Sequence, residues 1–178
     1  MEAQRRSLFI LIATGGAAVL GSYVLAFAYE PGIRAGLWGG IPESLQGFYT
    51  VNMLLAATSF FPATFLLGIK TPLDEFEAQT GMGWNRLMTA YAAILIPSAL
   101  WLPLTAFYIQ DPTGLLWIAI RIVLFLVGGG ASVVAYMLIR RAQQGPTLAW
   151  GAVVSFFFFW LQTMVLDALV WPWFYHAA

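Results

Sequence analysis

The sequence has no cysteine, one histidine and one lysine, and these shortages exclude several kinds of site. Without cysteine the chain forms no disulfide and holds no cysteine-ligated metal. The histidine, His176, is in the C-terminal tail, so neither haem ligation by two histidines nor a buried histidine–carboxylate relay is expected. The lysine, Lys70, falls in an expected loop, which excludes a retinal Schiff base inside a helix. We therefore expect no metal site and no cofactor.

Charge is also scarce, because only 9% of the residues are charged while 61% are hydrophobic. An ordinary soluble domain has roughly 25% charged residues. A soluble helix bundle would carry a polar stripe along each helix, and that stripe is largely missing here. The net charge is zero and no long basic run is present, so nucleic acid is not an expected partner. The composition predicts a protein whose surface is solvated by lipid.

The apolar residues fall into five runs, each long enough to cross a hydrocarbon core, which takes about 20 helical residues. The first run could be a signal peptide, because Arg5 and Arg6 precede it and residues 26–28 resemble a cleavage site. It is longer than the roughly 7–15 residues of a signal core, so a retained helix is expected. The sequence predicts an all-α, polytopic membrane protein in one domain, residues 1–178, with five transmembrane helices at about 7–29, 44–69, 84–109, 114–140 and 147–173.

The links between these runs carry their own signals. Residues 30–43 contain two prolines and four glycines, a composition that predicts a loop without regular helix. In residues 70–83, Thr71 is a candidate cap for a short surface helix. The short turn 110–113 makes the third and fourth helices antiparallel neighbours.

Lysine and arginine are distributed unevenly between the two sides of the expected bundle. With the N-terminus in the cytoplasm, six basic residues face the cytoplasm, and Arg34 alone lies outside the membrane on the far side. Basic residues in short loops favour the cytoplasmic side. The distribution predicts a cytoplasmic N-terminus and a C-terminus outside, in a plasma or inner membrane.

Two ionisable residues, Arg121 and Asp167, fall inside the expected spans. Both lie roughly 10 Å below the outer surface at 1.5 Å of helix rise per residue. Because a charge in hydrocarbon costs about 2.5–3.5 kcal/mol on insertion scales, a salt bridge between them is expected. This pair either pins two helices together or lines an outward-facing pocket for a polar group. A third reading has Arg121 reaching toward lipid headgroups.

Other polar and aromatic residues gather at the same depth. Trp117 is one turn from Arg121 and could stack on its guanidinium. Thr163 is expected to share a helix face with Asp167 and Trp160, at offsets of four and three residues. The expected ligand-binding residues are Arg121, Asp167, Asn52, Tyr49, Trp101, Trp117 and Thr163.

Small and helix-bending residues also fall inside the expected spans. Gly128–Gly130 lies near the middle of the fourth span and predicts close packing against a neighbouring helix, with a hinge or a flat wall against a ligand as the alternative. Pro62, Pro97 and Pro103 each remove a backbone hydrogen bond and can kink a helix. Pro103 is close to Trp101 and at the depth of the two charges, which favours a cavity there.

Five helices in fewer than 180 residues, with eight tryptophans, resemble the general format of the translocator-protein family. The run Leu100-Trp101-Leu102-Pro103 is the local sequence likeness. It covers four residues, so no functional residue is carried over from it.

Three functions fit this pattern. The first is a non-enzymatic membrane protein that binds or transports a small amphipathic or lipid-like molecule in the outer half of the bundle. The second is an enzyme that modifies a lipid or isoprenoid, with Asp167 as acid or base. The third is an accessory or assembly subunit of a larger membrane complex, and a homo-oligomer is also compatible with the sequence. The buried charges and the aromatic residues favour the first.

The absence of cysteine makes the orientation directly testable. We expect Asp111→Cys to react with a membrane-impermeant maleimide added outside intact cells, and Gln144→Cys to react only after the membrane is opened. Quantitative labelling in the two conditions checks this. The reverse labelling pattern would show that the N-terminus lies outside.

Overall fold

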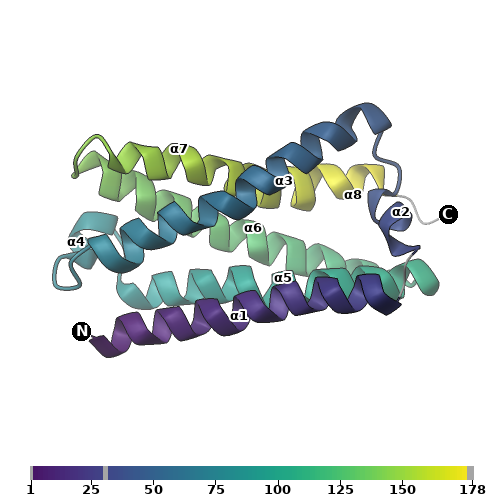
Figure 1. Ribbon diagram of the computed structural model, residues 1–178, viewed down its shortest axis with the longest axis horizontal. Coiled ribbons are helices and arrows are strands. Elements are labelled where there is room, and N and C mark those ends of the chain that lie inside the picture. Colours follow the sequence, from purple (N-terminus) through teal and green to yellow (C-terminus); the bar gives the residue numbers. More distant parts are fainter. Residues whose placement is uncertain (1, 30–31, 176–178) are drawn as a thin grey trace.

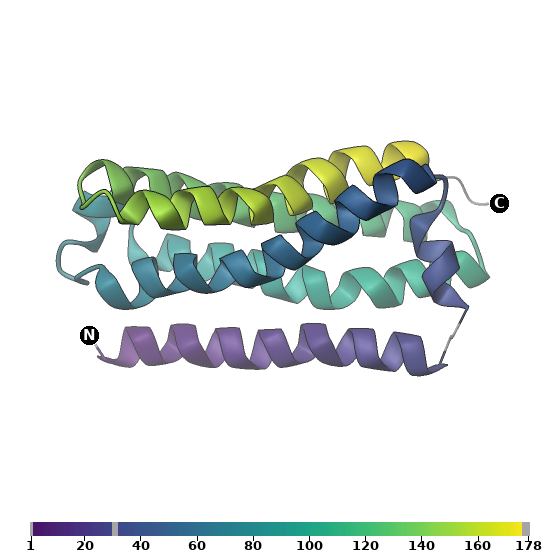
Figure 2. The same cartoon turned by 45° about the horizontal axis from the view of Figure 1, so that its top comes forward.

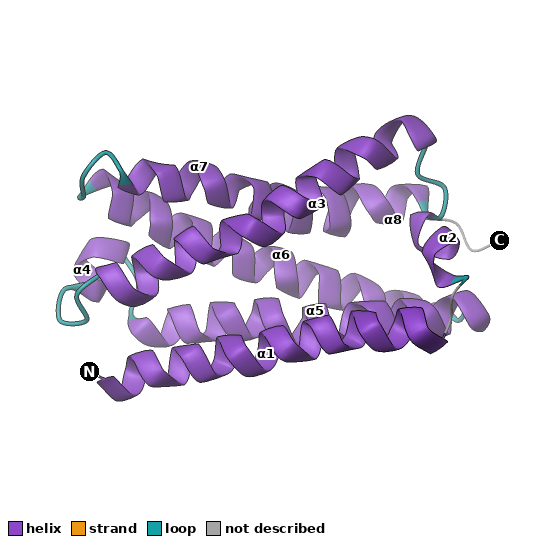
Figure 3. Ribbon diagram, viewed as in Figure 1, coloured by secondary structure: helices purple, strands orange, loops and turns teal. Residues whose placement is uncertain are grey.

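The computed structural model describes residues 2–29 and 32–175, so His176 lies outside the described residues. Within those ranges the chain is helical and contains no strand (Figure 3). The elements are α1 (Glu2–Tyr29), α2 (Ile33–Trp38), α3 (Glu43–Thr64), η1 (Phe65–Lys70), α4 (Phe76–Thr80), α5 (Trp84–Gln110), α6 (Gly114–Gln143), α7 (Ala149–Trp160), η2 (Leu161–Val170) and α8 (Trp171–Phe174). Segments η1 and η2 are π-helical and continue α3 and α7 without a break.

Five helical stretches are long and apolar enough to cross a membrane. They are Glu2–Ala28, Glu43–Lys70, Trp84–Gln110, Gly114–Gln143 and Ala149–Phe174. The bounds expected from the sequence agree with these to within a few residues. The all-helical, five-helix prediction is therefore confirmed at the level of length and composition.

Two expectations about the links are wrong in detail. Residues 33–38 form α2, although the prolines and glycines around them predicted no helix. The proline at position 31 precedes this short helix, and Gly39, with φ of 52°, ends it. A short surface helix, α4, does follow Thr71, but it begins after Glu75 and has no side-chain cap. Thr71 instead donates its hydroxyl to the carbonyl of Leu66, 2.9 Å away.

The helices lie side by side along the long axis of the molecule (Figure 1). Helix α5 packs against α6 as the short turn predicted, and the remaining neighbours follow in the order α1–α5–α6–α7–α3 around the bundle. Helix α1 approaches the α3 side mainly through η1 near one end and α2 near the other. Figure 2 shows α1 running along one side of the bundle. We call the two ends of the bundle the α4 end and the α2 end.

The two ends have different cores. At the α4 end, residues such as Leu8, Leu87 and Met137 are fully buried in a large cluster contributed by every long helix. At the α2 end, a smaller cluster contains Tyr49, Trp171 and other aromatic residues. Aromatic rings are buried at both ends, and those at the α4 end include Phe76, Tyr91 and Phe156.

Arginines stabilise the α4 end. The guanidinium of Arg5 donates to the carbonyls of Ile69, at 2.9 Å, and Thr71, at 3.1 Å. Arg141 donates from Nε to the hydroxyl of Thr71, at 3.3 Å. The last carbonyls of a helix lack intrahelical partners and carry partial negative charge, so cations bind there favourably. The start of α1, the end of η1 and the end of α6 are thereby tied together.

The glycine run in α6 packs closely against two neighbours. A Cβ added at Gly130 would lie 2.7 Å from the carbonyl oxygen of Ala90 in α5. A Cβ at Gly128 would lie 2.7 Å from Sδ and 3.0 Å from Cα of Met164 in η2. A Cβ at Gly129 would meet no atom within 4 Å. The predicted close packing is therefore found at the first and third glycines of the run.

This difference predicts opposite effects of alanine at adjacent positions. We expect Gly130→Ala to lower the free energy of unfolding by about 1–3 kcal/mol, because the backbone of α5 must shift. Gly129→Ala is the matched control and should be neutral or stabilising by up to about 1 kcal/mol, since alanine is the better helix former. Denaturation of purified protein in detergent measures both. Equal destabilisation by the two variants would contradict this packing.

Candidate functional site

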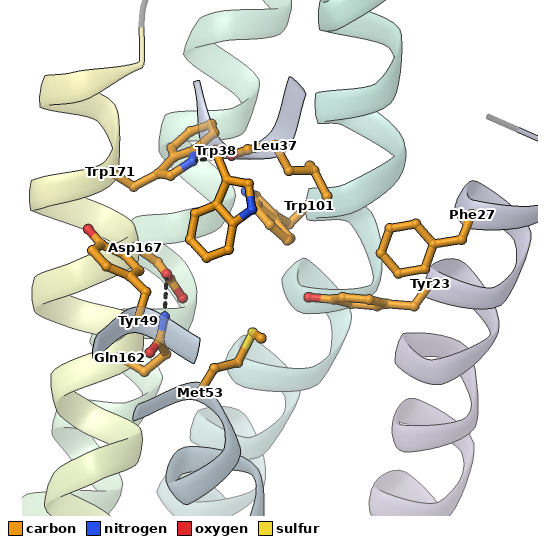
Figure 4. Close-up of a pocket in the computed structure, with 10 residues that line it drawn as sticks. All are labelled: Tyr23, Phe27, Leu37, Trp38, Tyr49, Met53, Trp101, Gln162, Asp167 and Trp171. Atoms are coloured by element: carbon orange, nitrogen blue, oxygen red, sulfur yellow. Dashed lines mark hydrogen bonds between the residues drawn. The ribbon is translucent and has the colours of Figure 1, made fainter. Parts of the chain in front are cut away.

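A pocket of about 250 Å³ lies at the α2 end, between α1 on one side and α3 and η2 on the other (Figure 4). Helix α5 and the short helices α2 and α8 complete its walls. Met53, 46% exposed, is one of the lining residues, so the pocket reaches the outer surface of the bundle at α3. The lining residues are Tyr23, Phe27, Leu37, Trp38, Tyr49, Met53, Trp101, Gln162, Asp167 and Trp171.

The polar part of this pocket is a chain of three side chains. Gln162 donates from Nε2 to Oδ1 of Asp167, at 2.8 Å. Asn52 donates from Nδ2 to Oε1 of Gln162, at 3.0 Å, and to the carbonyl of Phe158, at 3.2 Å. Because Oε1 of Gln162 accepts from Asn52, the amide nitrogen of Gln162 is turned toward the carboxylate. We call Asn52, Gln162 and Asp167 the polar chain.

The π-helical geometry of η2 makes this chain possible. Gln162 and Asp167 are five residues apart, and both lie in η2. In an α-helix, a residue and its fifth successor lie on different faces, whereas i→i+5 hydrogen bonding brings such residues closer together. The local winding therefore gives Asp167 a donor from its own helix. π-Helical turns occur often at functional sites.

Aromatic rings form most of the remaining wall. Tyr23 contacts Phe27 and Trp101, with ring centroids 6.0 and 6.3 Å apart. Trp101 also contacts Trp171 at 6.1 Å. In Figure 4 the rings of Tyr23 and Phe27 lie across the pocket from Asp167, with Trp38 and Trp101 between the two sides. The wall thus offers several aromatic rings to anything bound between them.

Backbone hydrogen bonds hold two of these rings. Trp171 donates from its indole to the carbonyl of Leu37, at 2.9 Å, and Tyr49 donates from its hydroxyl to the carbonyl of Leu166, at 3.2 Å. The indole nitrogen of Trp101 is buried and has no hydrogen-bond partner in the structure. A buried donor without a partner costs about 1–3 kcal/mol.

Of the seven residues expected from the sequence, three line the pocket: Tyr49, Trp101 and Asp167. A fourth, Asn52, is buried directly behind the lining and reaches it through Gln162. The fold therefore brings these four of the seven expected residues together.

Arg121 does not form the expected ion pair with Asp167. Its guanidinium lies over the ring of Phe125, 5.3 Å from the centroid, and its Nε is buried without a hydrogen-bond partner. The α6 residues that pack in the cluster at the α2 end are Ile120 and Leu124. Each helical residue advances by about 100°, so Arg121 is turned away from the direction of Ile120. The similar depth expected for Arg121 and Asp167 therefore did not mean that the two side chains point toward each other.

Trp117 and Thr163 also lie outside the pocket lining. Trp117 packs behind Trp171, at 5.9 Å, and against Tyr108 and Tyr175, at 5.4 and 5.7 Å. The sequence suggested that Trp117 could stack on the guanidinium of Arg121, but that guanidinium lies over Phe125 instead. Burial raises the pKa of Tyr175 above its ordinary value, so this phenol stays neutral within the cluster.

The hydroxyl of Thr163 donates to the carbonyl of Phe159, at 2.9 Å. Trp160, which was expected on the same face as Asp167, donates its indole to the hydroxyl of Ser132 in α6, at 3.0 Å. The prediction that Trp160, Thr163 and Asp167 share a face assumed an α-helix. The helix becomes π-helical after Trp160, so residues three and four apart no longer lie on one face.

Sequence reasoning missed Gln162 and the contribution of α1 to the site. A glutamine within an apolar run, five residues before the only acid of that run, was the available signal. Tyr23 and Trp38 were not among the residues expected to bind a ligand, although the sequence places Tyr23 in the outer half of the first span. Among the described residues, no group of three or more histidine, cysteine or acidic side chains could hold a metal ion.

The chain matches no known protein family, no curated protein and no solved structure.

The polar chain makes Asn52 important for stability. We expect Asn52→Leu to lower the free energy of unfolding by about 1–3 kcal/mol, because it leaves the buried Oε1 of Gln162 without a donor. The control is Thr50→Val in the same helix, whose exposed hydroxyl bonds only to the carbonyl of Gln46 and should matter little. Denaturation in detergent measures both variants. An Asn52→Leu protein as stable as Thr50→Val would disprove the importance of the chain.

Proposed function

We propose that this chain is a multi-pass membrane protein that binds or transports a small amphipathic molecule in the pocket at the α2 end. The observation that carries the proposal is the make-up of that pocket, in which an aromatic wall faces a hydrogen-bonded carboxylate. Ligand sites are mostly apolar, with a few polar groups that fix the orientation of the ligand. The volume of about 250 Å³ is below the 300–1,000 Å³ common for such sites, so the ligand, or the part of it that enters, is small.

The surface of the bundle supports a lipid environment. Large apolar side chains are exposed around it, including Leu20 at 70%, Leu115 at 79% and Leu148 at 86%. A water-soluble monomer rarely exposes such continuous apolar area. In this proposal the α4 end, which holds Arg5 and Arg141, faces the cytoplasm, the C-terminus lies outside, and the pocket occupies the outer half of the membrane.

The pocket is placed to receive a ligand from the lipid. Tyr23 and Phe27 on α1 form one wall, and Tyr49 and Met53 on α3 form another. These two helices do not pack extensively on each other within the described residues. A molecule dissolved in the outer leaflet would therefore reach the pocket between α1 and α3.

Binding is favoured over a continuous conducting path. The α4 half of the bundle is filled by fully buried side chains such as Leu67, Tyr91 and Phe156. A channel needs polar groups along its whole depth. Movement of a ligand across the membrane would require these helices to separate.

An enzyme that acts on a lipid or isoprenoid is the second candidate, because Asp167 lines the pocket and could transfer a proton. The retained molecule would then include a product of altered mass. An accessory subunit is the third, and in that case the pocket would stay without a ligand of its own.

Filling the pocket tests the proposal. We expect native mass spectrometry of the purified protein to detect a retained small molecule or lipid, and Met53→Trp to remove it by occupying the rim. Leu54→Trp, on the neighbouring lipid-facing position that is 63% exposed, is the matched control and should retain the molecule. Retention by Met53→Trp equal to that of Leu54→Trp would refute the pocket as the binding site.

A further inference from the structure

The charged side chain that lines the pocket is an acid. Asp167 is the only acid among the lining residues, and no described lysine, arginine or histidine lines it. The basic residue expected there, Arg121, lies over Phe125 instead. The sequence predicted an ion pair with no net charge at this site. Within the described residues, the pocket instead contains the carboxylate of Asp167 with no positively charged side chain beside it.

One carboxylate oxygen remains available to a ligand. Gln162 occupies Oδ1 of Asp167, and no hydrogen bond from a described residue reaches Oδ2. An ionised carboxylate only accepts hydrogen bonds, so it prefers a donor or a positive charge as its partner. In an apolar surrounding, the benefit of such a partner is larger than in water.

The aromatic wall favours the same kind of partner. Three tryptophans, two tyrosines and one phenylalanine line the pocket. The face of an aromatic ring carries partial negative charge and attracts cations, most strongly in tryptophan. Figure 4 places Trp38 and Trp101 next to the space between Asp167 and Tyr23. A cation in that space would meet the carboxylate on one side and rings on the others.

We propose that the ligand is a small organic cation, an ammonium group attached to a short apolar part. The inference rests on the proposed function and adds the sign of the ligand's charge. The ammonium group would lie between the carboxylate of Asp167 and the rings of Trp38 and Trp101. The apolar part would point toward Met53 and the opening between α1 and α3. An anionic ligand of the same size would be rejected by Asp167.

Three probes of matched shape test the proposal: benzyltrimethylammonium, its uncharged analogue neopentylbenzene, and the anion phenylmethanesulfonate. Their dissociation constants are measured with purified protein in nanodiscs of neutral lipid. We expect the cation to bind at least about tenfold more tightly than the neutral analogue, which corresponds to about 1.4 kcal/mol. The anion should show no saturable binding.

Two variants separate the contributions to this preference. Asp167→Asn keeps an oxygen that can accept from Gln162 but removes the charge, and should cut the cation's advantage to about threefold or less. Trp38→Leu should weaken the cation more than the neutral analogue, because leucine is apolar but has no ring face. Asp111→Asn, in the exposed turn after α5, is the control and should leave all three constants unchanged. If Asp167→Asn cannot be purified folded, the ranking of the probes on the unaltered protein decides alone.

The outcomes distinguish this inference from the proposed function. Equal affinity for cation and neutral analogue, with both lost in Met53→Trp, would overturn the cation preference and leave the pocket as a binding site. Preference for the anion would overturn it too. Failure of all three probes, while native mass spectrometry still detects a molecule that Met53→Trp removes, would overturn only the ligand class. Failure of the probes with no retained molecule would overturn both proposals.

Discussion

A carboxylate among apolar helices must be supplied with hydrogen-bond donors, and this requirement organises the α2 end of the bundle. Asp167 takes its donor from Gln162, and Gln162 is oriented by Asn52. Asn52 belongs to α3, so the same contacts that satisfy the acid also join α3 to η2. Any change in this chain therefore alters helix packing and the pocket together, because one set of atoms serves both.

The pocket at this end is bordered by large aromatic rings. In the middle of the bundle, Gly128 and Gly130 let α6 approach its neighbours so closely that an added Cβ would lie 2.7 Å from an atom of Met164 or Ala90. At the α2 end, rings meet at centroid separations of 4.3 to 6.3 Å, and six of them line the pocket. Tyr175 closes this end by packing on Gly39, where the positive φ and the missing Cβ make room for the ring.

The long helices could be predicted from the sequence, because length and hydropathy are properties of the chain that need no knowledge of packing. Short helix α2 could not, since its six residues are held by contacts such as the indole of Trp171 on the carbonyl of Leu37. For the site, counting residues from the span ends gave an expected depth for each polar side chain. Tyr49, Trp101 and Asp167, which were selected in this way, line the pocket, as does Gln162, which was not selected.

What the sequence could not supply is the direction in which each side chain points around its helix. In a soluble protein the polar stripe marks the outside, but these helices are apolar on every face, so that signal is absent. The π-helical turns of η2 then add an irregularity that a constant 3.6-residue repeat cannot follow. Arg121 shows the consequence, since its guanidinium lies over Phe125 and does not form the expected ion pair with Asp167. Because Arg121 does not pair with Asp167, the carboxylate lines the pocket without a neighbouring positive charge. The direction of the Arg121 side chain therefore determines the net charge of the pocket lining.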